Sequence, residues 1–281
     1  NYPARNNSKK DDSMSSSPIG VMDSGIGGLG VHKHIKALLP GERLIYVADT
    51  VFCPYGALPV KKVRHRCLLI ARFFLAQNCK MITIACNTAT AAAIETVRST
   101  FPDIPVVGME PAVKPAALHT KSGVVGVLAT PGTFRGSLYN RTLAAFAGQV
   151  KVTEKVGEGW VGAVERGELD SPATREMVRK VIQPMLDAGA DHLVLGCTHY
   201  PFLVPVIRSI TGPGVVIVDP APAVARRVKQ LLTEKGLLSG SAPAPEKDLY
   251  YTSCSDTSVL PKAVPYTANG GTINWRPYTF E

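Results

Sequence analysis

The chain has 281 residues, with 31 basic and 22 acidic side chains and a net charge of +9 at neutral pH. A chain of this length can form one large or two medium-sized α/β domains around an ample core. Its apolar runs fall short of the roughly 18 residues that a membrane-spanning helix needs, and the polar residues 1–17 lack the apolar segment of a secretory signal. We therefore expect a cytoplasmic protein that does not associate with membranes.

The basic residues are scattered along the chain, and only residues 61–66 form a dense basic run. This run lies in a segment with helical periodicity, where such charges typically form a solvated face. A nucleic-acid surface instead gathers its Lys and Arg residues in a patch or stripe. We therefore do not expect a nucleic-acid partner.

Strands and helices are predicted to alternate through most of the chain. The first half predicts strands at 19–23, 44–48, 80–85 and 106–109, and helices at 29–39, 60–77 and 89–100. The second half predicts strands at 124–129, 150–156, 192–195 and 215–218, and helices at 133–146, 160–166, 171–188, 200–210 and 221–234. Such alternation is typical of α/β proteins with parallel sheets and right-handed crossovers.

Both ends of the chain carry weaker patterns. Residues 1–18 are polar with almost no apolar side chains, which predicts a disordered extension. After residue 236, a Ser/Ala/Pro-rich linker at 239–245 precedes a predicted edge strand at 249–252, and residues 261–281 show little helical signal. We expect this tail to pack on the surface of the first domain or to stay partly mobile.

Two cysteines, Cys86 and Cys197, each end a predicted buried strand and are followed by small polar residues. Open parallel sheets bind ligands at the carboxyl ends of their strands. For either cysteine alone, packing as a small buried hydrophobe is the simpler interpretation. The matching context in the two halves favours chemistry, because two thiols on opposite sides of one molecule can move a proton between the faces of a carbon.

The remaining cysteines, which carry no companion pattern, are expected to be ordinary packing or surface thiols: Cys53, Cys67, Cys79 and Cys254. Six cysteines in all are too few for a disulfide scaffold, and their spacing fits no zinc motif.

Several polar residues accompany the two thiols. The glycine-rich turn after Asp23 lacks a phosphate-loop signature, so Asp23 is expected to bind a substrate ammonium, to assist a thiol or to cap the next helix. His199 lies close enough to Cys197 to orient or deprotonate it, although a Cys–His pair also suits a hydrolase or an amidotransferase. The loop at Tyr55 could bind a carboxylate or form a simple turn, and Glu165 could be an ordinary surface-helix residue.

Together these segments resemble the glutamate racemase family. The matching motifs, which occur in the family's order between residues 19 and 234, are 23–28 (DSGIGG), 54–56 (PYG), 86–90 (CNTAT), 129–133 (ATPGT) and 196–201 (GCTHYP). The resemblance implies cofactor-independent, metal-free racemisation of L- and D-glutamate by paired cysteines, which supplies D-glutamate for peptidoglycan and so supports cell-wall biogenesis and cell shape.

The resemblance also implies a fold and assembly. It implies two flavodoxin-like parallel-sheet domains that face each other across an active-site cleft, with residues 19–111 and 222–281 in the first domain and 112–221 in the second. It further implies a homodimer and a peptidoglycan-precursor activator. An aspartate or other amino-acid racemase of the same superfamily, or a gyrase-binding role, is an alternative.

The resemblance assigns roles to individual residues. Cys86 takes the α-proton from D-glutamate and Cys197 takes it from L-glutamate; Asp23 assists Cys86, while His199 and Glu165 assist Cys197. Tyr55 and Gly56 bind the side-chain carboxylate. The amino and α-carboxylate groups are held by Ser24, Asn87, Thr88, Thr130, Thr133 and Thr198, together with Asp23 and His199.

Overall fold

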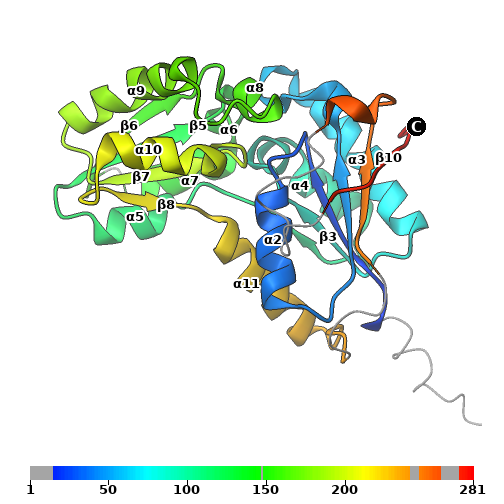
Figure 1. The fold of residues 1–281 in the computed structure, drawn as a ribbon. Coiled ribbons are helices and arrows are strands. Elements are labelled where there is room, and N and C mark those ends of the chain that lie inside the picture. The colour runs from blue at the N-terminus through cyan, green and yellow to red at the C-terminus, as the bar shows by residue number, and fades with distance from the viewer. Residues whose placement is uncertain (1–14, 147, 241–246, 261–271) are drawn as a thin grey trace, which may run out of the picture.

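The computed structural model describes residues 15–146, 148–240, 247–260 and 272–281 and arranges them in two α/β lobes (Figure 1). The first lobe contains a sheet with the described strand order β10-β9-β2-β1-β3-β4, in which each pair of neighbours is parallel. Its strands are β1 (Ile19–Asp23), β2 (Leu44–Ala48), β3 (Met81–Ile84), β4 (Val106–Val107), β9 (Leu249–Thr252) and β10 (Trp275–Pro277). The predicted α/β class with parallel sheets is confirmed.

The second lobe contains a parallel sheet with the described order β6-β5-β7-β8. Its strands are β5 (Val124–Ala129), β6 (Lys151–Val156), β7 (His192–Gly196) and β8 (Val216–Val218). The two central strands are almost completely buried, whereas the outer strands β6 and β8 are partly exposed. The carboxyl ends of the central strands therefore offer the rigid edge on which a ligand site can be built.

Helices cover both faces of each sheet. The helices are α2 (Leu29–Leu38), α3 (Val60–Ala76), α4 (Asn87–Thr100), α5 (Val113–His119), α6 (Pro131–Phe134), α7 (Ser137–Phe146), α8 (Trp160–Glu165), α9 (Pro172–Asp187), α10 (Val204–Thr211) and α11 (Ala221–Glu234). Short 3₁₀ turns are η1 (Thr50–Phe52), η2 (Tyr55–Ala57), η3 (Tyr200–Leu203) and η4 (Thr257–Val259). In the first lobe α2 and α11 pack together, and α3 packs on α4.

Alternate residues of the first sheet enter different cores. In β1, Val21 packs in the core beside α2 and α11, whereas Met22 packs in the core beside α3 and α4. Alternating side chains point to opposite faces of a strand, so a sheet buried on both faces reads as a continuous apolar run. The core beside α2 continues into the second lobe through Leu193 and Leu195 of β7. Although α11 follows β8 of the second lobe, it packs in the first (Figure 1).

The predicted elements differ from the observed ones in a few places. The helix predicted at 133–146 is two helices, α6 and α7, and the helix predicted at 200–210 begins as the 3₁₀ turn η3. The strand predicted at 106–109 is only β4, and α5 was missed. The prediction of an edge strand at 249–252 is wrong in position, because β9 lies between β2 and β10.

The ends of the chain are described in part. Of the predicted disordered extension, residues 1–14 lie outside the described residues. Pro18, by contrast, accepts a hydrogen bond from the Lys80 N–H at 2.9 Å, so residues next to β1 are held against the start of β3. In the tail, 241–246 and 261–271 lie outside the described residues, while β9 and β10 extend the first sheet.

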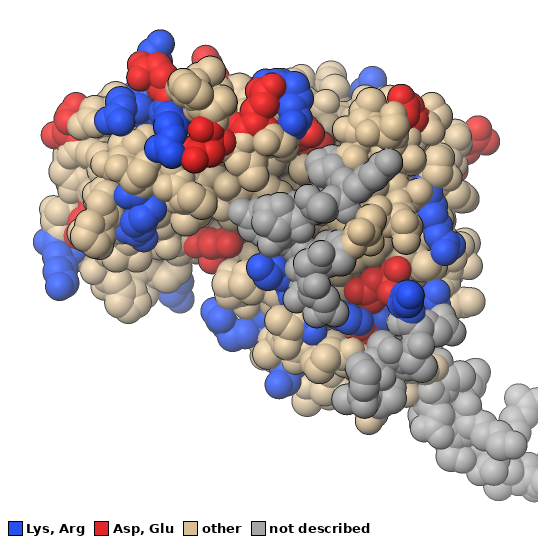
Figure 2. Space-filling model, viewed as in Figure 1, with Lys and Arg blue, Asp and Glu red and all other residues tan. Residues whose placement is uncertain are grey.

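Charged side chains are dispersed on the molecular surface. On the face shown in Figure 2, Lys and Arg side chains are spread over both lobes and interspersed with acidic ones. The predicted solvated face of α3 holds for Lys61, Lys62 and Arg64, but Arg66 is buried and pairs with Asp49 at 2.9 Å. Among the described residues, we find no helix that is both long and apolar enough to cross a membrane.

Candidate active site

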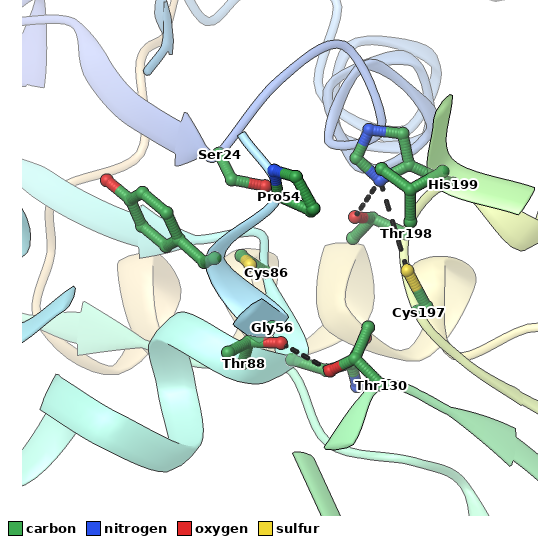
Figure 3. A pocket seen from close by; sticks show the side chains of 12 residues that line it. Ser24, Pro54, Gly56, Cys86, Thr88, Thr130, Cys197, Thr198 and His199 are labelled. Carbon is green, nitrogen blue, oxygen red and sulfur yellow. Dashed lines mark hydrogen bonds between the residues drawn. The ribbon is translucent and has the colours of Figure 1, made fainter. Parts of the chain in front are cut away.

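A small cavity lies between the lobes at the carboxyl ends of their central strands (Figure 3). It leaves about 10 Å³ free, which is room for about one water molecule. The lining residues come from both lobes: Ser24, Pro54, Tyr55, Gly56, Cys86, Asn87, Thr88, Thr130, Val161, Cys197, Thr198 and His199. The structure therefore brings both strand-end cysteines to one site.

Cys86 caps the amino end of α4, which begins two residues earlier than the sequence predicts. Its backbone is still extended, and its Sγ accepts a hydrogen bond from the Ala89 N–H at 3.5 Å. Burial raises the pKa of the Cys86 thiol well above its usual value, and the nearby Asp23 carboxylate raises it further, while the Ala89 N–H lowers it. Cys86 is therefore held as a protonated thiol in this arrangement.

Cys197 enters the cavity from the second lobe, directly after β7. Its Sγ lies 3.9 Å from Nδ1 of His199, the first residue before the η3 turn. Both side chains are buried. A thiol in contact with an imidazole has a partner that can take or return its proton.

Glu165 holds the other side of His199. Its Oε1 lies 2.5 Å from His199 Nε2 and also accepts a hydrogen bond from the Ile26 N–H of the first lobe at 2.8 Å. Burial alone would lower the pKa of His199, but its contacts with Cys197, Cys53 and Glu165 raise it well above its usual value. Burial would likewise raise the pKa of Glu165, but His199 and the Ile26 N–H lower it. The two side chains therefore form an ion pair.

Asp23 ends β1 and is completely buried. Its carboxylate accepts hydrogen bonds from the Gly25 N–H at 3.0 Å and from the Thr198 hydroxyl of the second lobe at 3.1 Å. Burial raises the pKa of Asp23, although His199 and the Gly25 N–H partly oppose this. A carboxyl with a raised pKa can exchange a proton more readily near neutral pH than an exposed one.

Three threonines link the lobes beside the cavity. Thr88 at the start of α4 lies 2.7 Å from Thr130, and Thr133 lies 3.1 Å from Thr130 and 3.4 Å from Thr88 (hydroxyl to hydroxyl). Thr130 also caps α6 by accepting from the Thr133 N–H at 3.3 Å. Thr133 is in contact with two lining residues without being a lining residue itself.

Tyr55 lines the cavity with its hydroxyl directed away from it. The hydroxyl donates to Asp49 at 2.5 Å, and Arg66 donates to both carboxylate oxygens of Asp49 at 2.9 Å. Arg66 also donates to the Phe280 carbonyl at 3.1 Å. This buried network leaves the backbone of Tyr55 and Gly56, rather than the phenol, to face a ligand.

Three residues at this site were given no role by the sequence analysis, although Pro54 belongs to the 54–56 motif. Pro54 and Val161 line the cavity, and Cys53 directs its thiol at Glu165 Oε1, 3.7 Å away. The prediction that Cys53 is an ordinary packing or surface thiol is therefore wrong. The available signal was its position directly before the Pro54–Gly56 motif; nothing local marks Val161.

Similarity to known proteins places the chain in a family. The family model described as Asp/Glu/Hydantoin racemase matches residues 19–228, which is well over half of the chain. The chain therefore belongs to the Asp/Glu/hydantoin racemase family.

Within that family the chain is similar to glutamate racemases. The glutamate racemase of Roseiflexus sp. (strain RS-1) is 50% identical over 225 residues, which cover 80% of this chain and 83% of that protein. The Escherichia coli glutamate racemase, solved in complex with L-glutamate and the activator UDP-MurNAc-Ala, superposes with a TM-score of 0.81 at 29% identity over 93% of this chain and 98% of that one. The Francisella tularensis glutamate racemase, solved in complex with D-glutamate, has a TM-score of 0.75 at 30% identity over 87% and 92% of the respective chains.

Proposed function

We propose that this protein interconverts L- and D-glutamate by a two-base mechanism without a cofactor, and so supplies D-glutamate for peptidoglycan synthesis. The observation that carries the proposal is the placement of two buried thiols, Cys86 and Cys197, on one cavity from opposite lobes. The similarity to glutamate racemases over most of the chain supports glutamate as the substrate.

Each thiol acts on one face of the substrate Cα. With D-glutamate, the Cys86 thiolate removes the α-proton, the electron pair stays on Cα, and the Cys197 thiol protonates the opposite face. With L-glutamate the two thiols exchange roles. Asp23 takes up the proton that must leave Cys86, and His199, held by Glu165, serves Cys197. The donors around the cavity must stabilise the negative charge that develops on the substrate.

The other lining residues would hold the substrate. Hydroxyl and amide side chains line the cavity together with the two thiols and can form hydrogen bonds with the amino and α-carboxylate groups of an amino acid. These side chains belong to Ser24, Asn87, Thr88, Thr130 and Thr198. The backbone at Tyr55 and Gly56 is proposed to bind the side-chain carboxylate. Thr133, which contacts Thr88 and Thr130, is proposed to position them.

We further propose that residues 19–111 and 222–281 form one domain and residues 112–221 the other. We also propose that the protein acts as a homodimer in the cytoplasm and that a peptidoglycan precursor activates it. These proposals follow the resemblance to glutamate racemases, of which the Escherichia coli protein is solved with such an activator.

Circular dichroism of L-glutamate, D-glutamate and L-aspartate during incubation tests the proposal. We expect loss of the signal from both glutamate enantiomers and a far slower change with aspartate. Loss of the aspartate signal alone would show that the protein is an aspartate racemase of the same family. A Cys197→Ser variant that kept full racemisation would contradict the two-thiol mechanism.

A further inference from the structure

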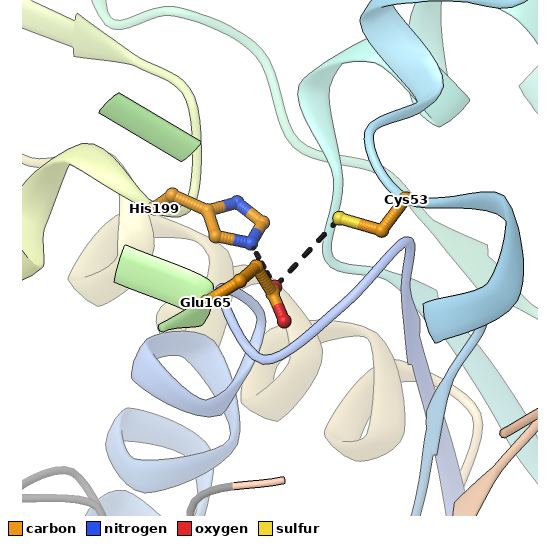
Figure 4. Close-up of side chains that lie close together, drawn as sticks. All are labelled: Cys53, Glu165 and His199. Atoms are coloured by element: carbon orange, nitrogen blue, oxygen red, sulfur yellow. Dashed lines mark hydrogen bonds and ion pairs between the residues drawn. The ribbon is translucent and has the colours of Figure 1, made fainter. Parts of the chain in front are cut away.

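A cluster of potential metal ligands, Cys53, Glu165 and His199, adjoins the cavity and shares His199 with it (Figure 4). Cys53 comes from the segment between η1 and η2 of the first lobe, whereas Glu165 ends α8 and His199 precedes η3 in the second. Their donor atoms Sγ, carboxylate oxygen and ring nitrogen all lie within 4.8 Å of one another. Cys53 has no part in the proposed proton transfers, so this convergence needs another explanation.

The three donors fit a zinc ion. Thiolate, imidazole and carboxylate are the protein ligands of four-coordinate Zn²⁺, and at the usual bond lengths such ligand atoms lie about 3.3–3.8 Å apart. The distance from Cys53 Sγ to Glu165 Oε1 is 3.7 Å, which already falls in this range. Oε1 and His199 Nε2 are 2.5 Å apart, so they must separate by about 1 Å when an ion replaces the proton between them.

The backbone at Gly25 packs so closely against Glu165 and Cys53 that a side chain there would collide with them. A Cβ atom at Gly25 would lie 2.0 Å from Glu165 Oε1 and 3.0 Å from Cys53 Sγ. The Ile26 N–H and the Cys53 thiol, both from the first lobe, contact the same carboxylate oxygen of Glu165 as His199 does. Both lobes therefore bring the donors together before any ion binds, and only Glu165 and His199 must move apart to accept one.

We propose that Cys53, Glu165 and His199 form a Zn²⁺ site, completed by a water molecule or a substrate atom, and that the bound ion inhibits racemisation. On binding, the Cys53 thiol and the His199 imidazolium each release one proton to solvent. The ion then replaces the proton on His199 Nε2, and the Nδ1–H that faces Cys197 becomes a much weaker acid, because its loss would leave an imidazolate. Proton exchange between His199 and Cys197 is therefore impaired, and the ion also ties the first lobe to the second.

Binding is tested with the intact protein by calorimetric titration with Zn²⁺ and by the thiolate-to-metal absorption band of Co²⁺. We expect one equivalent to bind the wild type with a thiolate band, and Cys53→Ser, which keeps a hydrogen-bond donor beside Glu165, to lose the band and weaken binding by about tenfold or more. Cys254→Ser, which changes a part-exposed thiol outside the cluster, should match the wild type. Undiminished binding and band in Cys53→Ser would overturn the site.

Inhibition is tested separately by racemisation assays with and without Zn²⁺. We expect the ion to inhibit the wild type, a chelator to restore activity, and Cys53→Ser to need about tenfold more Zn²⁺ for the same inhibition. Equal sensitivity of the two proteins would place the inhibitory ion elsewhere, for example on Cys86 and Cys197, and would overturn the proposal. The Co²⁺ band does not depend on racemisation, so failure of the proposed function would be distinguishable from failure of the metal site.

Discussion

At the scale of residues, the two thiols have different partners. Cys86 lies near the buried carboxyl of Asp23, whereas Cys197 contacts an imidazole that is ion-paired to Glu165. The equilibrium constant of a racemisation is one, so kcat/KM must be the same in both directions at every pH. The asymmetry of the partners can therefore appear only in kcat and KM taken separately.

Replacing Glu165 tests the ion pair. We expect Glu165→Gln to lower the pKa of His199, followed by proton NMR, and to lower kcat by about 10²-fold because Cys197 loses its proton partner. Glu168→Gln, which changes an exposed carboxylate paired with Arg166, is the matched control and should leave the pKa of His199 and kcat unchanged. An unaltered His199 pKa in Glu165→Gln would contradict this account.

The same pair predicts a pH dependence of stability. The pKa of His199 is raised in the folded protein, so its stabilising effect is complete below the ordinary value of 6.5 and is lost as the pH rises through the raised value. The difference in unfolding free energy between the wild type and Glu165→Gln, measured with urea, should therefore be largest just below pH 6.5 and shrink in alkali. A difference that grew in alkali would contradict the ion pair.

At the scale of elements, α3 supports the cavity wall from behind. Arg66 reaches from this helix to Asp49, which holds Tyr55, and to the carbonyl of Phe280 near the end of the chain. Both charged side chains are almost completely buried. The network therefore couples a helix, the lining segment at Tyr55 and the C-terminal residues.

Removal of the arginine tests this coupling. We expect Arg66→Met to lower the free energy of unfolding by about 3–5 kcal/mol, because it leaves the Asp49 carboxylate buried and unpaired. Arg64→Met, an exposed position on the same helix, should change it by no more than about 0.5 kcal/mol. Urea denaturation measures both, and equal stabilities of the two variants would contradict the structural role of the network.

Local pattern predicted most elements but not the contacts between them. The alternation of apolar strands and amphipathic helices predicted β2, β5 and α11 to the residue. It missed α5, a seven-residue helix with Pro115 in its first turn, and it ran α6 and α7 together across Gly136. Short, proline-containing helices carry too few periods to show a pattern.

The site was predictable to a similar extent. Each strand-end thiol is followed by polar residues in the sequence, so both could be proposed directly. The contacts of Glu165 with Ile26 and Cys53 join residues far apart in the chain, and they exist only because the lobes pack face to face. No local signal reports such an approach.

At the scale of the whole molecule, the structure is closed. The cavity has room for about one water molecule, and glutamate is several times larger. Three hydrogen bonds span the lobes: one between the Thr88 and Thr130 hydroxyls, one from Thr198 to Asp23 and one from the Ile26 N–H to Glu165. The lobes must therefore separate for substrate to enter and for product to leave.

A glycine at the contact between the lobes tests closure. A methyl group at Gly25 would collide with the Glu165 carboxylate, whereas Gly30 on α2 has no atom within 4 Å of an added Cβ. We expect Gly25→Ala to raise the radius of gyration in X-ray scattering and to lower kcat/KM by about 10²-fold. Gly30→Ala should have the radius of gyration and the kcat/KM of the wild type. If Gly25→Ala also kept both values, the closed arrangement of the lobes would not be the catalytically active one.

The central claim is that each thiol serves one face of Cα, and solvent deuterium tests it most directly. Each glutamate enantiomer is incubated in D₂O with the enzyme, and the α-position of recovered substrate and of product is analysed early in the reaction by mass spectrometry after chiral separation. Two bases predict deuterium chiefly in the product from either direction, because the thiol that donates has exchanged with solvent and the thiol that abstracts has not. Equal early labelling of substrate and product would indicate one shared base and would contradict the account.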